Sequence, residues 1–207
     1  MILVGQYDSP FTRRVAISLR LLGLPYEHDT RSVFGDFASM LGTNPLGRIP
    51  VLVLDDGGAL IDSAAILDWL DETVGPSRAL IPPSGEARRR ALQTIALASG
   101  AIEKIGAANY ERLIRPSVYR WPEWIARCLT QFDGAVTALA ALPWPPEAPL
   151  DQAAITTACM IDYARLTDPA ALPPGRHPRL DALAARCNAL PAFQATAVRE
   201  YQVPRAE

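Results

Sequence analysis

Short apolar runs and amphipathic stretches alternate over the first 75 residues of the chain. The apolar runs have the length of strands and lie at residues 2–5, 26–29, 51–54 and 59–61. The last two flank a turn rich in aspartate and glycine, which is typical of a hairpin. Apolar positions at helical spacing predict a helix over residues 10–22 and another over residues 62–74, with a short irregular helix over residues 33–41.

This order of elements, with a parallel pair of strands first and a hairpin last, resembles the thioredoxin fold. Beyond residue 85 the strand signals end, and helical patterns follow at residues 86–115, 121–142, 152–166, 178–190 and 191–198. The predicted fold class is therefore α/β plus all-α. We expect a thioredoxin-like domain at residues 1–76, a linker at 77–85 and an all-helical domain at 86–207.

Composition narrows the class of protein. The 207 residues are 49% hydrophobic and 20% charged, as in soluble globular proteins. A net charge of -2 offers no basic field for nucleic acid. The N-terminus does not read as a signal peptide, and no uncharged apolar run approaches the roughly 20 residues of a membrane helix. We therefore expect a cytoplasmic protein that binds neither nucleic acid nor membrane.

The cysteines and histidines indicate no metal site. The three cysteines Cys128, Cys159 and Cys187 have no CxxC spacing, and we expect buried free thiols. The two histidines, His28 and His177, lie far from any cysteine cluster.

The start of the first predicted helix carries the first chemical signal. Ser9 is a good N-cap, and Pro10 suits the first helical position because it needs no amide partner. The first-turn amides and the helix dipole favour a negative charge beside Ser9, such as a thiolate. Ordinary capping is the alternative explanation for this serine.

Two further segments carry signals that are modest by themselves. Pro50 immediately precedes a buried strand, which suits a cis peptide bond after Ile49 and an outward-facing backbone that can pair with an extended peptide. Asp62 and Ser63 stand at a strand-to-helix junction, where the hydroxyl and the first amides can hold a carboxylate. A proline at a strand start and ordinary N-capping are the alternatives.

Because these three signals occur together in this order and spacing, the chain resembles the bacterial cytosolic glutathione transferases over essentially its whole length. The resemblance rests on three segments: Ser9-Pro10-Phe11-Thr12-Arg13-Arg14-Val15, Asn44-Pro45-Leu46-Gly47-Arg48-Ile49-Pro50 and Asp62-Ser63-Ala64-Ala65-Ile66. It implies conjugation of the glutathione thiolate to a small hydrophobic electrophile, a role in detoxification, glutathione as co-substrate without a metal, and a homodimer. One departure is Pro149-Leu150-Asp151-Gln152, which stands where the family usually has a Ser/Thr-x-x-Asp capping box.

The resemblance also implies roles for single residues. Ser9 matches the catalytic position, and Tyr7 is the second candidate for activating the thiol. The residues expected at glutathione are Arg48, Ile49, Pro50, Asp62 and Ser63. The residues expected in the electrophile pocket are Tyr7, Phe11, Thr12 and Tyr110, with Trp121 and Trp124 as further candidates.

Several readings remain open from the sequence. Arg13 and Arg14 are most simply solvated or structural charges and not anion sites, and Glu103 is most simply an exposed helix charge. Another glutathione-dependent activity, such as isomerisation, peroxide reduction or dehalogenation, would suit the same scaffold. A transferase-like protein that binds or regulates without catalysis is the third reading.

Overall fold

A computed structural model describes residues 1–198. The N-terminal part is a four-stranded sheet of order β2-β1-β3-β4, with β1 (Ile2–Val4) parallel to β2 (Glu27–Asp29). β3 (Val51–Val53) runs antiparallel to both β1 and β4 (Ala59–Ile61). This confirms the predicted thioredoxin-like topology.

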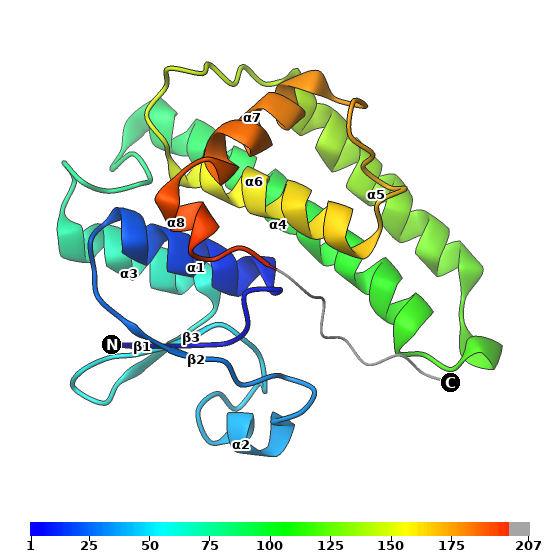
Figure 1. Ribbon diagram of the computed structural model, residues 1–207, viewed down its shortest axis with the longest axis horizontal. Coiled ribbons are helices and arrows are strands. Elements are labelled where there is room, and N and C mark those ends of the chain that lie inside the picture. Colours follow the sequence, from blue (N-terminus) through cyan, green and yellow to red (C-terminus); the bar gives the residue numbers. More distant parts are fainter. Residues whose placement is uncertain (199–207) are drawn as a thin grey trace.

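The two faces of the sheet bury alternate residues, as the period of two along a strand requires. Leu3 and Leu52 face one another across the β1–β3 pair and join the core under α1 (Pro10–Leu21) and α3 (Ser63–Val74). Their neighbours Val4 and Val51 point to the other face, where Met40 of α2 (Phe37–Leu41) covers them. Figure 1 shows α1 and α3 together on one side of the sheet and α2 on the other.

The rest of the described chain is helical. Its main helices are α4 (Gly85–Leu113), α5 (Pro122–Ala141), α6 (Gln152–Thr167), α7 (Pro178–Asn188) and α8 (Pro191–Gln194). A short 3-10 helix, η1 (Ser117–Tyr119), stands between α4 and α5 and was not predicted. The core of this part is shared by α4, α5, α6 and α7, and the α4–α5 hairpin projects beyond the sheet (Figure 1).

The join between the two parts is polar as well as apolar. The Asp71 carboxylate accepts hydrogen bonds from the backbone N–H groups of Leu80 and Ile81 at 2.7 and 3.0 Å. Helix α1 also packs against α6, and Arg13 on α1 forms an ion pair with Asp162 on α6 at 2.6 Å. The two hydrogen bonds to Asp71 hold the segment that we predicted as a linker against α3.

The altered capping segment before α6 still holds a cap. Asp151 is the N-cap residue, and its carboxylate accepts from the backbone N–H of Ala154 at 2.8 Å. An aspartate at this position satisfies one of the free amides of the first turn. The departure from the Ser/Thr-x-x-Asp pattern therefore leaves α6 capped.

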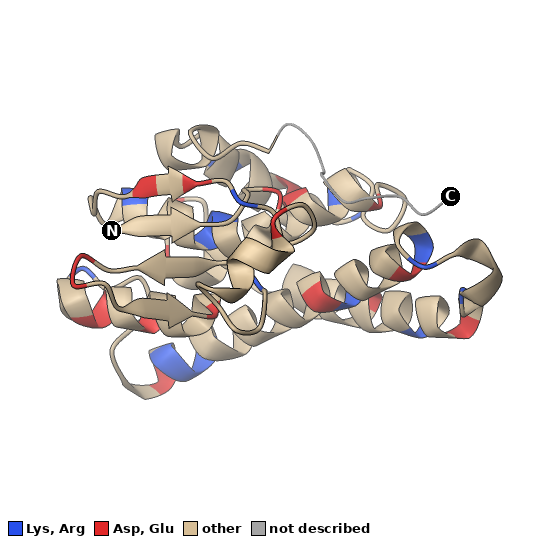
Figure 2. Ribbon diagram, turned by 90° about the horizontal axis from the view of Figure 1, so that it is seen from below, with Lys and Arg blue, Asp and Glu red and all other residues tan. Residues whose placement is uncertain are grey.

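Basic and acidic residues are interspersed over the ribbon in Figure 2 rather than gathered by sign. Within residues 1–198, no helix combines the length and the apolar character needed to cross a bilayer.

Candidate functional site

Two adjoining cavities lie between the sheet domain and helix α4. The smaller, about 330 Å³, is lined by loops and helix starts of the N-terminal part and by α4. The larger, about 590 Å³, extends from Ser9 toward α2 and the later part of α4. Both cavities are lined by Phe11, Arg48, Ile49 and Glu103, so they adjoin one another at these residues.

Ser9 lines the larger cavity and is the N-cap of α1. Its Oγ accepts a long hydrogen bond, 3.4 Å, from the backbone N–H of Thr12. A hydroxyl has one proton and two lone pairs, so this cap leaves the Ser9 proton available for a second group. The serine can therefore cap the helix and donate into the cavity at the same time.

The loop before β3 brings the central predicted residues to the site. Arg48 and Ile49 line both cavities, and Pro50 lines the smaller one. The bond between Ile49 and Pro50 is cis, as predicted. Asn44 shapes the loop, because its buried amide donates to the Arg48 carbonyl at 2.7 Å and accepts from the Leu46 N–H at 2.9 Å.

Asp62 and Ser63 also line the smaller cavity. Asp62 has a φ of 68°, the positive value rarely seen outside glycine, and caps α3 by accepting from the Ala64 N–H at 2.8 Å. Strain of this kind costs on the order of 1–3 kcal/mol and is concentrated at functional sites. The turn places the buried Ser63 hydroxyl at the helix start, facing the cavity.

Arg14 also lines the smaller cavity, and its role was missed from the sequence. Its guanidinium donates to Ser63 Oγ at 2.6 and 3.2 Å, to Ser99 Oγ at 3.0 Å and to Thr156 Oγ1 at 3.5 Å. It is 2% exposed, and burial lowers its pKa to about 10, so it stays charged near neutral pH. All its described hydrogen-bond acceptors are neutral hydroxyls, and none of the ion pairs within residues 1–198 includes it.

The groups that accept hydrogen bonds from Arg14 are neutral hydroxyls, while the nearby Asp62 carboxylate raises the pKa of Arg14 through its opposite charge. A desolvated cation is stabilised by opposite charge, so the cavity beside Arg14 suits a further anion. Neither Arg13 nor Arg14 is solvated. Arg13 is structural through Asp162, whereas Arg14 faces the cavity. The sequence could not distinguish these two roles, because the groups that accept from Arg14 lie on three other helices, α3, α4 and α6.

The larger cavity contains some of the residues predicted for an electrophile pocket and lacks others. Phe11 and Tyr110 line it. Thr12 is fully buried and is not among the lining residues. Trp121 and Trp124 stack on one another beyond the end of α4 and are also outside the lining. Phe34 and Phe37 line the cavity and were missed, because the irregular segment that carries them shows no clear periodicity.

Tyr7 lines a third cavity beside α6, which adjoins the larger one at Asp8, Pro10 and Tyr163 but does not include Ser9. Its hydroxyl is 2.9 Å from that of Tyr26, and its ring stacks on His28 at 4.0 Å between centroids. Burial and the Tyr26 hydrogen bond raise the pKa of Tyr7, so its hydroxyl remains protonated near neutral pH. Of the two candidates for activating the thiol, Ser9 lines the cavity that also contains Arg48 and Ile49, and Tyr7 does not.

Within residues 1–198, no cluster of three His, Cys, Asp or Glu side chains could hold a metal ion. The three cysteines are free and buried, as predicted. Burial raises the thiol pKa of Cys159 to about 12 and that of Cys187 to about 11, so neither is a ready nucleophile.

A family model described as "Glutathione S-transferase, N-terminal domain" matches residues 3–78. Among solved structures, a glutathione transferase family member from Pseudomonas fluorescens Pf-5 with bound glutathione is 31% identical. The match has a TM-score of 0.83 and covers 94% of this chain and 97% of that one. A glutathione S-transferase from Methylobacterium radiotolerans in complex with glutathione sulfonate is 27% identical, with a TM-score of 0.87 and coverage of 100% and 95%.

Curated relatives match over shorter stretches. The maleylacetoacetate isomerase of Pseudomonas aeruginosa is 33% identical over 120 residues, which is 56% of each chain. The uncharacterized GST-like protein YibF of Escherichia coli K12 is 29% identical over 127 residues, 61% of this chain and 62% of that protein. The chain therefore spans just over half to three fifths of the length of these two relatives.

Proposed function

The chain belongs to the glutathione transferase family, and from that premise we propose that it conjugates the glutathione thiolate to a small hydrophobic electrophile. The observation that carries the proposal is the site formed by the two adjoining cavities. It presents a buried cation with hydroxyl partners at one end and a helix-capping serine at the other.

We place the γ-glutamyl end of glutathione in the smaller cavity. Its α-carboxylate would accept from the Ser63 hydroxyl and the first amides of α3, with Arg14 supplying the opposite charge behind Ser63. The backbone of Ile49 would pair with the cysteinyl unit, next to the cis bond at Pro50. Arg48 at the junction of the cavities and Asp62 at the helix start complete this set.

The sulfur then lies near Ser9, whose hydroxyl would donate to the thiolate. A free thiol has a pKa of about 8.5, and lowering it by two units takes about 2.7 kcal/mol. A hydrogen bond to a charged group supplies about 1.5–3 kcal/mol. A helix N-terminus adds about 0.3–1 kcal/mol. One serine on one helix therefore suffices, and no general base is required.

The larger cavity would hold the electrophile against the sulfur, with Phe11 and Tyr110 in its walls. The matched isomerase from P. aeruginosa supports a second candidate, glutathione-dependent isomerisation on the same scaffold. The two activities differ in the product. A conjugate retains the glutathione sulfur, whereas an isomerase returns glutathione unchanged.

The test of the proposal is the thiol pKa of bound glutathione. The ultraviolet absorbance of the thiolate is titrated in the wild-type protein, in Ser9→Ala and in Tyr7→Phe. We expect Ser9→Ala to raise the pKa and lower turnover near neutral pH with little change in glutathione affinity. Tyr7→Phe is the matched control that also removes one hydroxyl. A shift in the Tyr7 variant alone would assign activation to Tyr7, and a shift in neither would contradict catalysis by this site.

We further propose that the protein is a cytoplasmic homodimer that serves detoxification, with domains at residues 1–76 and 86–207 joined by the linker at 77–85. The family resemblance supports the dimer and the location. Sedimentation equilibrium of the purified chain tests the dimer directly, and a mass of 22.4 kDa would contradict it.

A further inference from the structure

Helix α2 is too short to be stable by itself. It spans the five residues Phe37–Leu41, whereas an isolated helix in water needs about 12–15 residues. Of these five residues only Met40 is buried. The last carbonyl groups of α2 have no partner within the helix, as at the end of any helix. Contacts from outside α2 must therefore hold it in place.

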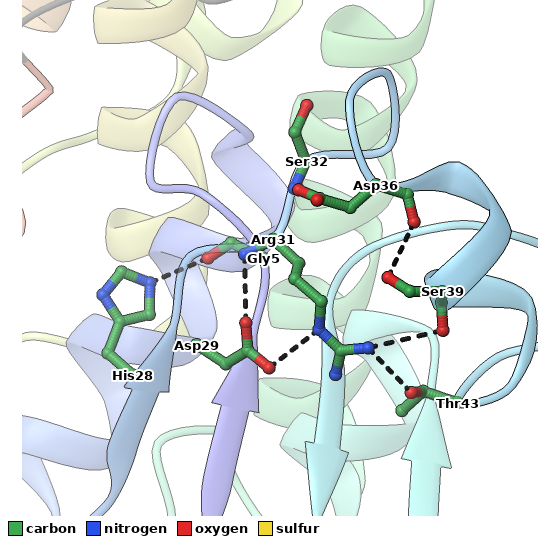
Figure 3. Close-up of polar contacts among 8 residues, drawn as sticks. All are labelled: Gly5, His28, Asp29, Arg31, Ser32, Asp36, Ser39 and Thr43. Carbon is green, nitrogen blue, oxygen red and sulfur yellow. Dashed lines mark hydrogen bonds and ion pairs between the residues drawn. The ribbon is translucent and has the colours of Figure 1, made fainter.

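Arg31 supplies such contacts from the start of the α2 segment, residues 31–44 (Figure 3). Its guanidinium donates to Thr43 Oγ1 at 3.2 Å and to the Ser39 carbonyl oxygen at 3.4 Å. Ser39 lies on α2, and Thr43 follows the C-cap residue Gly42. A cation that bonds the last carbonyl groups of a helix also opposes the negative end of the helix dipole. Arg31 therefore stabilises the C-terminal end of α2.

Arg31 is also fixed to the sheet. Its Nε donates to the Asp29 carboxylate at 2.8 Å, and its backbone N–H donates to the same carboxylate at 3.1 Å. Both side chains are less than a third exposed, so solvent screens this ion pair only in part. Asp29 ends β2, and its carbonyl oxygen accepts from the Gly5 N–H at 2.8 Å directly after β1. Arg31 thus joins α2 to a point of the sheet that two strands hold.

Helix α2 in turn supports the loop before β3. The Met40 carbonyl oxygen accepts from the Asn44 N–H at 2.8 Å, and the Asn44 side chain shapes that loop from within. The Phe37 ring lies so close to Gly47 that no Cβ would fit at this glycine. Ile49, two positions further along the chain, lines both the smaller and the larger cavity. A displaced α2 would therefore displace the backbone that faces the site.

We infer that Arg31 is a positioning residue for glutathione. The inference rests on the proposed function, in which the backbone of Ile49 pairs with the cysteinyl unit. Arg31 lines neither the smaller nor the larger cavity, so it acts through α2 and the loop before β3. It holds this loop in the binding arrangement before glutathione arrives, which lowers the entropy lost on binding.

The experiment separates glutathione binding from thiol activation. In Arg31→Met, the Kd for glutathione from calorimetry should rise about 3–10-fold, which corresponds to the loss of about one net hydrogen bond. The pKa of the bound thiol and kcat at saturating glutathione should stay at their wild-type values, because Ser9 is retained. Ser9→Ala should show the opposite pattern. An unchanged Kd, or a shifted thiol pKa, in Arg31→Met would overturn the inference.

Further variants test the route through Thr43. Thr43→Val removes the hydroxyl that accepts from Arg31 and should also raise the Kd. The double variant should bind glutathione about as well as Arg31→Met alone, because both changes remove the same contact. Arg31→Lys keeps the charge beside Asp29 but lacks the planar fork, and should restore part of the affinity. Fully additive losses in the double variant would overturn the inference.

Arg176→Met is the matched control. Arg176 also combines an ion pair, with Asp133, and a hydrogen bond to a backbone carbonyl oxygen, that of Ala171 at 2.9 Å. It lines neither the smaller nor the larger cavity, and its loss should leave the Kd for glutathione unchanged. An equal rise in Kd for Arg176→Met and Arg31→Met would show a general effect of losing an ion pair and would overturn the inference.

Amide hydrogen exchange separates this inference from the proposed function, because it needs neither glutathione nor turnover. In the ligand-free protein, exchange over residues 40–47 should be faster in Arg31→Met than in Arg176→Met. That result with a raised Kd supports positioning by Arg31 even if no conjugate forms, which would contradict only the proposed function. Unchanged exchange over residues 40–47 would overturn the inference and leave the proposed conjugation intact. If Arg31→Met does not fold, the same measurements on Thr43→Val decide the matter.

Discussion

Removing the charge of Arg14 should weaken glutathione binding. The substitution leaves Ser9, the residue that we place beside the glutathione sulfur, unchanged. Arg14 is 2% exposed and donates twice to the Ser63 hydroxyl. In our proposal the Ser63 hydroxyl accepts from Arg14 and donates its own proton to the α-carboxylate of the γ-glutamyl unit. Arg14→Gln keeps a hydrogen-bond donor at this position but removes the positive charge.

The magnitude follows from the geometry. The nearer guanidinium nitrogen lies 2.6 Å from Ser63 Oγ. A carboxylate oxygen that accepts from this hydroxyl lies about 2.7 Å beyond it, which puts the two charges about 5 Å apart. At an effective dielectric constant of about 20 they attract by roughly 3 kcal/mol. Solvent at the open side of the cavity reduces this to about 2 kcal/mol, or roughly 30-fold in Kd.

The assay is a cycle in which the protein and the ligand each lose one charge. Calorimetry gives the Kd of the wild-type protein and of Arg14→Gln for glutathione and for γ-aminobutyryl-cysteinylglycine, which lacks only the α-carboxylate. The wild-type protein should prefer glutathione strongly, and Arg14→Gln should lose about 2 kcal/mol of that preference. Arg14→Lys, which keeps the charge, should retain most of it.

A coupling below about 0.3 kcal/mol, within the range found for independent sites, would refute the assignment of Arg14 to the carboxylate. Arg20→Met is the control, because Arg20 is an exposed arginine on the same helix. Thermal unfolding of each variant shows whether any loss of affinity comes from a damaged fold. A purely structural Arg14 would change the unfolding temperature and leave the ligand preference unchanged.

Three further substitutions test the fold around the site. Gly47→Ala should destabilise the protein more than Gly57→Ala does. Both glycines have positive φ, but only at Gly47 would a Cβ lie 2.3 Å from an atom of the Phe37 ring. Equal unfolding temperatures of the two variants would contradict this prediction. Asp151→Ala should cost about 1 kcal/mol through loss of the α6 cap, and an unchanged denaturation midpoint would show that the cap adds no stability. Burial raises the pKa of Asp71 above its usual value, so its contribution to stability is fully present below about pH 4 and declines as the pH rises through the higher folded-state pKa. The stability difference between wild type and Asp71→Asn, from denaturation midpoints at acid to neutral pH, should therefore shift against the wild type as the pH rises, and a shift in the opposite direction would contradict the burial effect.

Local sequence patterns determined the order of the elements and their ends. The Ser9 cap and the Asp62 cap depend on residues within a few positions, so propensity and spacing were enough to suggest them. The cis bond at Pro50 was expected mainly from the family resemblance, because the proline by its position alone suits an ordinary strand start equally well. The same local patterns predicted the parallel pair and the hairpin of the sheet. They could not detect η1, because a single 3-10 turn has too few residues to show a period.

Only the tertiary structure decided where the side chains of α1 and of the α2 segment lead. Arg13 and Arg14 are adjacent in sequence, yet one reaches Asp162 on α6 and the other reaches Ser63 on α3. Phe34 becomes a cavity wall because the sheet and α4 place Tyr110 against it. A side chain's partner can come from a residue many positions away, and a local pattern carries no information about that distance. The sequence therefore determines which chemical groups the chain possesses, and the packing of helices on the sheet decides which of them share a site.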